Sequence, residues 1–152
     1  MRGVLLISTV LFIFSACGNA FPPASGPVDI ALRELPEKDP MRRNLQKVYN
    51  KIQHTKVLCA QKIGESGGDR DKLADILAGC VDQASKLRLE VRSLMGWLMD
   101  LRYEKAFAAI IKEVRTLIRF YSGARQCVLQ SNTQKEFDAC VMSLTGEINQ
   151  RF

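Results

Sequence analysis

Residues 73–98 read LADILAGCVDQASKLRLEVRSLMGWL. Apolar or cysteine side chains recur here at alternating intervals of four and three residues, at Leu73, Leu77, Cys80, Ala84, Leu87, Val91, Leu94 and Leu98. This spacing places them on one side of an α-helix, as in a coiled-coil seam. The stretch therefore predicts a long helix packed against other helices. Asp69 or Asp71 can cap its start, and Gly96 is a suitable residue for its end.

Three further segments also have helical periods. One covers about Met41 to Ile63 and ends at the breaker Gly64-Glu65-Ser66-Gly67-Gly68. Another covers about Tyr103 to Tyr121, with Gly123 as its expected stop. The last begins at Thr133-Gln134-Lys135-Glu136, which has the form of a capping box. Since no segment alternates with a period of two, the sequence predicts an all-α fold, a four-helix bundle without a sheet.

The first twenty residues have the three parts of a secretory signal peptide, namely the basic Arg2, an apolar run from Val4 to Phe14, and the small-residue exit Gly18-Asn19-Ala20. We expect residues 1–20 to be removed and the mature protein to be secreted and extracellular. A less favoured alternative is a bacterial lipoprotein modified at Cys17. No later apolar run is long enough to span a bilayer, so we expect no stable membrane insertion.

All five prolines lie between residues 21 and 40. This composition predicts an extended, Pro-rich leader, in which a short helical turn around Ile30 to Leu35 would end at Pro36. Residues 41–152 are then the bundle domain.

Four cysteines remain after the signal peptide, namely Cys59, Cys80, Cys127 and Cys140. An even number in an exported protein predicts two disulfides. In an up-up-down-down bundle Cys59 lies level with Cys140, and Cys80 lies level with Cys127. In an up-down-up-down bundle the level partners are on diagonal helices, too far apart for a bridge. We therefore expect the up-up-down-down order with bridges Cys59–Cys140 and Cys80–Cys127.

The chain has 22 Lys and Arg against 16 Asp and Glu, a net charge of +6. Such an excess suits an acidic receptor surface, a glycosaminoglycan or nucleic acid. Nucleic acid is the least favoured of these partners, because no aromatic residues are interleaved with the basic residues.

The single histidine, His54, and the absence of known catalytic motifs predict a protein that is not an enzyme. We expect no metal and no cofactor, because the cysteine spacings are long and no CxxC pair occurs.

Basic residues form two rows at helical spacing. Arg43, Lys47 and Lys51 recur in the first helix, and the second row is made by Lys112, Arg115 and Arg119 in the third. Each row is either a docking surface for an acidic partner or simply the solvated outer face of an amphipathic helix.

Local stretches resemble the interleukin-4/interleukin-13 group of short-chain helical cytokines. Gly26-Pro27-Val28 with Ala31-Leu32-Arg33-Glu34-Leu35 resembles the start of mature interleukin-13. The stretch from Leu45-Gln46 to Val57-Leu58-Cys59 is similar to the first helix of interleukin-4, and Leu117-Ile118-Arg119-Phe120 resembles its third. Cys80 and Cys127 fall where that group joins the second helix to the segment after the third. The family uses an acidic residue on the first helix, where this chain has a basic row.

The resemblance implies a secreted, monomeric ligand that binds and pairs cell-surface receptor chains to trigger immune signalling. We expect the receptor-binding residues to be Lys47, Lys51, Lys112, Arg115 and Arg119. The alternative is a secreted helical carrier, or a venom or salivary protein, that holds a small apolar ligand between its helices. The filled Leu and Val layers of residues 73–98 favour the receptor ligand.

Overall fold

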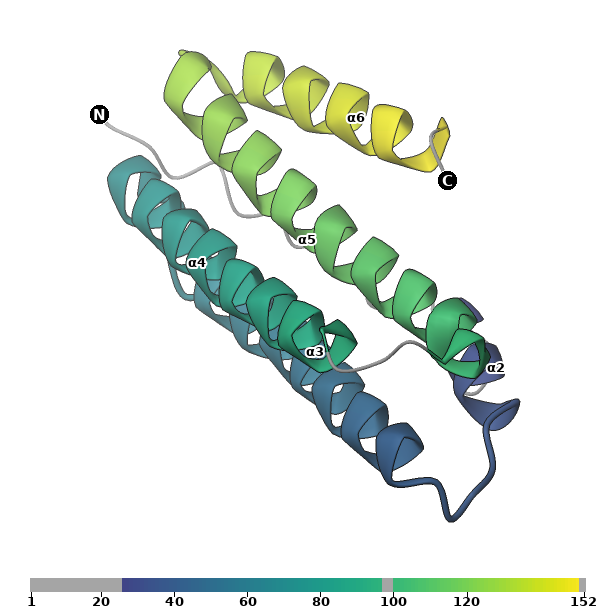
Figure 1. Cartoon of the computed structure of the whole chain (residues 1–152). Coiled ribbons are helices and arrows are strands. Elements are labelled where there is room, and N and C mark those ends of the chain that lie inside the picture. Colours follow the sequence, from purple (N-terminus) through teal and green to yellow (C-terminus); the bar gives the residue numbers. More distant parts are fainter. Residues whose placement is uncertain (1–25, 97–99, 151–152) are drawn as a thin grey trace.

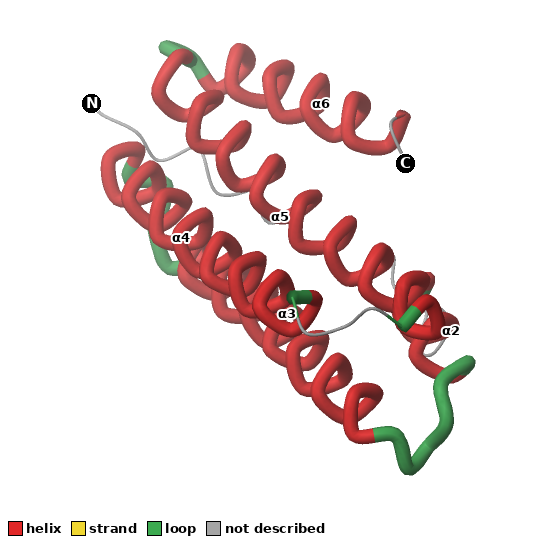
Figure 2. The backbone as a smooth tube through the Cα atoms, in the orientation of Figure 1, coloured by secondary structure: helices red, strands yellow, loops and turns green. Residues whose placement is uncertain are grey.

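The computed structural model describes residues 26–96 and 100–150, and every regular element among them is helical (Figures 1 and 2). In chain order these elements are α2 (Pro27–Arg33), α3 (Pro40–Gly64), α4 (Arg70–Met95), the 3-10 turn η1 (Leu101–Tyr103), α5 (Glu104–Gln130) and α6 (Gln134–Gln150). The predicted all-α class is confirmed. The predicted signal peptide and the first five leader residues lie outside the described residues.

Helix boundaries follow the local signals of the sequence. The Asp39 carboxylate caps α3 by accepting a hydrogen bond from the Met41 amide, and Asp69 caps α4 in the same way through Lys72. At the start of α6 the Thr133 hydroxyl accepts from the Glu136 amide at 3.2 Å, while the Glu136 carboxylate accepts from the Thr133 amide at 3.3 Å. The predicted capping box is therefore confirmed.

Consecutive long helices run antiparallel (Figure 1). The connection from α3 to α4 consists of residues 65–69, in which Gly67 and Gly68 have positive φ angles of 64° and 81°. A parallel arrangement would require this connection to return along the 25 residues of α3, about 37 Å, whereas residues 65–69 reach about 20 Å. The expected up-up-down-down order is not found, because α3 is too long and its linker too short.

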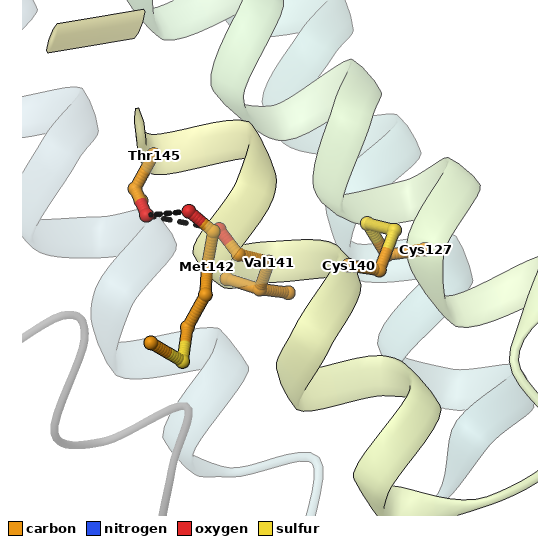
Figure 3. Close-up of a disulfide and its surroundings, with 5 residues drawn as sticks. All are labelled: Cys127, Cys140, Val141, Met142 and Thr145. Atoms are coloured by element: carbon orange, nitrogen blue, oxygen red, sulfur yellow. Dashed lines mark hydrogen bonds between the residues drawn. A yellow bond between two sulfur atoms is a disulfide. The ribbon is translucent and has the colours of Figure 1, made fainter. Parts of the chain in front are cut away.

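The disulfides correct the predicted pairing. Cys59 of α3 is bonded to Cys80 of α4, with 6.0 Å between their Cα atoms, and Cys127 of α5 is bonded to Cys140 of α6, with 5.7 Å between theirs (Figure 3). Each bridge therefore joins two helices that are neighbours in sequence. The Cys59–Cys140 pair was wrong because α6 packs chiefly against α5 and not beside α3.

Gly123 does not end the third long helix, as the sequence suggested; α5 continues to Gln130 and carries Cys127 within its last turns. The reason for a glycine here is tertiary. A Cβ atom at position 123 would lie 2.6 Å from Leu144 Cδ1 of α6, so the missing side chain lets α6 lie close to α5.

α5 is the centre of the fold. It packs against α4 along most of its length and also against α6 and α2, whereas its contact with α3 is slight. Figure 1 shows α6 on the far side of α5 from α3, so the four long helices do not close into a ring. The helix buries one continuous face, made of Ala106, Phe107, Ile110, Ile111, Val114, Leu117, Tyr121, Ala124, Cys127 and Val128.

Much of the expected leader belongs to the folded core. Residues 27–33 form α2, with Pro27 in the first turn, and the chain leaves the helix before Pro36 as predicted. Val28, Ala31 and Leu32 are buried against α5 and α3. The sequence allowed a helical turn only around Ile30 to Leu35; the helix starts earlier, at Pro27, because the apolar residues recur at intervals of three and four, which gives α2 a face to bury.

We expect Leu32→Ala to lower the free energy of unfolding by about 2–4 kcal/mol, because the side chain is 2% exposed and its loss leaves a cavity beneath α2. Ile30→Ala on the same helix is the matched control, since Ile30 is 48% exposed, and it should cost less than about 1 kcal/mol. Urea unfolding of the mature protein measures both. Equal effects of the two substitutions would mean that α2 does not pack as described.

Tryptic digestion under non-reducing conditions should release peptide 57–62 bonded to peptide 73–86, and peptide 126–135 bonded to peptide 136–151. Mass spectrometry identifies both pairs, and reduction separates them into four free peptides. A species joining 57–62 to 136–151 would instead indicate the Cys59–Cys140 bridge and would contradict the antiparallel order of helices.

Candidate functional site

The first basic row lies on the outer surface of α3. Arg43, Lys47 and Lys51 are all exposed, while the opposite side of the helix buries residues such as Leu45 and Ile52. Lys51 Nζ lies 2.6 Å from Glu90 Oε1 of α4. Because both side chains are substantially exposed, this ion pair contributes little stability, but it shows that the row lies along the edge of α3 next to α4.

The second basic row lies on α5, where Lys112, Arg115 and Arg119 are exposed. Between residues 105 and 130 the sequence of α5 contains a single acidic residue, Glu113. Its carboxylate forms an ion pair with Lys56 of α3, and both side chains are about four-fifths buried. The acidic group therefore points toward α3, and the outer face of α5 keeps an excess of positive charge.

The structure does not bring the two rows together. On α4, Glu90 faces α3, whereas Arg70 faces α5, where its guanidinium donates to the carbonyl oxygens of Val128 and Leu129 at 2.7 and 2.8 Å. These two α4 residues are 90 − 70 = 20 positions apart, about five and a half helical turns, so they lie on opposite sides of the helix. The outer surface of α4 consequently separates the α3 row from the α5 row.

Two further basic residues, Arg88 and Arg92 of α4, extend the α5 row. Because α4 and α5 are antiparallel, each step forward along α4 from Arg70 corresponds to one step back along α5 from residues 128–129. Arg88 is therefore level with about residue 111 of α5, and Arg92 is level with about residue 107. Arg92 is exposed, and Arg88 is half-buried, with an Nε atom that is shielded from solvent and has no acceptor among the described residues. Sequence reasoning missed both because their place beside α5 depends on the register of the two helices.

A small hydrogen-bonded cluster holds the start of α5 against the start of α3. The Tyr103 hydroxyl donates to Asp39 Oδ2 at 2.7 Å, while Asp39 Oδ1 accepts from the Met41 amide at 2.8 Å. The Arg102 guanidinium lies over the Tyr103 ring, 5.6 Å from its centroid. The bond from Tyr103 lowers the pKa of Asp39, and the same bond raises the pKa of Tyr103. The cluster therefore favours a charged Asp39 and a neutral Tyr103.

Tyr49 joins α3 to its neighbours from inside the fold. Burial is the main cause that raises its pKa to about 12, and the nearby carboxylates of Asp29 on α2 and Glu113 on α5 act in the same direction. The phenol therefore stays protonated at neutral pH, as suits a packing residue.

His54 is exposed on α3. Within residues 26–96 and 100–150, no group of three or more His, Cys, Asp or Glu side chains is arranged to hold a metal ion. Among the described helices, none combines the length and the apolar character needed to cross a bilayer.

Comparisons with protein-family models, with curated proteins and with solved structures find no match to this chain.

Tyr103→Phe should lower the melting temperature at neutral pH, with a deficit that shrinks as the pH falls. Because the folded-state pKa of Asp39 is depressed, the stability that this carboxylate contributes is present above its ordinary pKa of about 4 and is lost as the pH falls through the depressed value. Thermal unfolding followed by circular dichroism between about pH 2 and pH 7 tests this. In an Asp39→Asn background the effect of Tyr103→Phe on the melting temperature should no longer vary with pH over this range. If it still varies, the pH dependence is caused by a titratable group other than Asp39.

Proposed function

We propose that the chain is a secreted, cytokine-like ligand that binds two receptor chains at the cell surface and brings them together in immune signalling. The single observation that carries this proposal is the presence of two exposed basic rows on different sides of one small helical domain. Pairing of receptors requires two separate contact surfaces on one ligand, and the separation of the rows by α4 supplies them.

Several features support an extracellular site of action. The Cys59–Cys80 and Cys127–Cys140 disulfides suit an oxidising compartment, and residues 1–20 have the form of a secretory signal peptide. The local resemblance to the interleukin-4/interleukin-13 group points in the same direction. The helix order differs from the up-up-down-down order of that group, so the proposal depends on surfaces and export and not on a shared topology.

On this proposal Lys47 and Lys51 contact one receptor chain, and Lys112, Arg115 and Arg119 contact the other. A single receptor domain would have to reach around α4 to touch both rows. The resemblance to the interleukin-4/interleukin-13 group would instead imply that one receptor chain contacts the face made by the first and third helices.

The test combines export with receptor capture on cells. When the full chain is expressed in a eukaryotic host, the protein recovered from the medium should begin at Phe21. The labelled protein, cross-linked to intact leukocytes, should capture two membrane proteins. Lys47→Glu/Lys51→Glu should lose one of them by about tenfold or more, and Arg115→Glu/Arg119→Glu should lose the other.

Both variants change exposed residues on regular helices, so each serves as the folding and charge control of the other. Three results would contradict the proposal: the whole protein stays inside the host, both variants lose the same membrane protein, or the protein does not bind to intact cells. A small apolar molecule found in the intact protein by native mass spectrometry would instead support a carrier.

A further inference from the structure

The register set by the Arg70 contacts places two basic residues of α4 level with the basic row of α5, and we name the five residues together the basic band: Arg88, Arg92, Lys112, Arg115 and Arg119. Arg92 lies level with about residue 107 of α5, so the band extends from there to Arg119, a distance of about 18 Å along the helix axis. All of its members are exposed except the half-buried Arg88.

The four arginines of the band keep their charge exposed to an outside partner. In the described part of the chain, Arg88, Arg92, Arg115 and Arg119 form no ion pair. Two acidic residues of these helices are paired elsewhere, Glu113 with Lys56 of α3 and Asp82 with Lys86 of α4. Residues of one charge held close together repel one another, so a bound polyanion would relieve this repulsion.

We infer that the basic band binds a sulfated polysaccharide of the glycosaminoglycan class. A guanidinium group can donate two parallel N–H hydrogen bonds to the oxygens of one sulfate or carboxylate group, and four of the five residues in the band are arginines. A linear polyanion lying along the seam can contact Arg92, Arg115 and Arg119 in succession. The inference rests on the proposed secretion, because this class of polymer is found outside the cell.

The surroundings of the band favour a polysaccharide over nucleic acid. Binding of single-stranded nucleic acid uses aromatic side chains on which bases stack. The aromatic residues of α5 do not supply them, because Phe107 and Tyr121 are buried and Phe120 is half-buried. Between residues 107 and 119 of α5, all of which the structure describes, the one exposed residue that is not basic is the small Ala108.

Occupation of the band also regulates the proposed receptor contact, because Arg115 and Arg119 belong to both surfaces. Polysaccharide on the band would hold the ligand near cells and would have to leave α5 before a receptor chain binds there. The α3 row, on the other side of α4, stays free in the meantime.

The experiment measures binding of the disulfide-bonded mature protein to immobilised heparin, with no receptor present. We expect Arg115→Glu/Arg119→Glu to weaken binding by about tenfold or more at physiological salt and to elute from heparin at lower salt than the unmodified protein. Chemically desulfated heparin should bind the unmodified protein at least about tenfold more weakly than heparin does. A single-stranded oligonucleotide of similar length should compete less well than heparin.

Arg43→Glu/Lys47→Glu is the matched control, since its two residues are exposed, four positions apart and on the α3 row, and the change in net charge is the same. Its heparin affinity should fall about threefold or less. Equal losses in the two variants would overturn the inference by showing that net charge alone attracts heparin, and tighter binding of the oligonucleotide would assign the band to nucleic acid. If the protein does not bind heparin, the capture of two receptor chains on cells is still tested by its own experiment. Failure of one proposal can therefore be distinguished from failure of the other.

Discussion

The packing of α5 against α4 is the contact on which the rest of this structure depends. Ile110 and Val114 of α5 are completely shielded from solvent, as are Ala84 and Val91 of α4. Full burial of a side chain the size of Val or Ile contributes roughly 1.5–3 kcal/mol relative to exposure, and the two helices bring several such side chains together. α2 and α6 add to the other sides of α5, so a change in the position of this helix would disturb its contacts with α2, α4 and α6.

The two disulfides act locally within this arrangement. Each links helices that follow one another in the sequence, with separations of 21 and 13 residues. In the chain-entropy account, closing loops of this length stabilises a fold by about 3 kcal/mol each. The bridge between α5 and α6 has the greater structural consequence, because α6 packs chiefly against α5 and, among residues 134–148, buries only Phe137 and Val141. Met142, the residue after Val141 on the same helix, is exposed (Figure 3).

Local signals in the sequence were sufficient for the helices themselves. Four predictions depend on residues within a few positions of one another, and the structure confirms each of them: the seam from Leu73 to Leu94, the Asp69 cap, the end of α3 at Gly64 and the Thr133–Glu136 capping box. Leu98 of the predicted seam lies outside the described residues. Gly123 failed as a signal because its role is set by Leu144 on another helix. Because of that error the predicted third helix was too short and Cys127 lay outside it. Cys127 then appeared to lie at the same height in the bundle as Cys80, which favoured the wrong pairing. The exposure of both basic rows was also predictable, but their separation by α4 was not, since it requires the order of the helices in space.

The distribution of charge follows from the same packing. α5 has to present an apolar face to α4, α2 and α6, which leaves a narrow strip for its polar residues. Its acidic residue Glu113 lies at the edge of that face and is paired with Lys56 of α3, so the negative charge lies mostly inside the fold. The strip that remains outside contains Lys112, Arg115 and Arg119. The only acidic residues of α5 are Glu113 and, at the start of the helix, Glu104. The internal ion pair thereby helps to join α3 to α5 and, by the same placement, leaves the outer face of α5 available to an anionic partner.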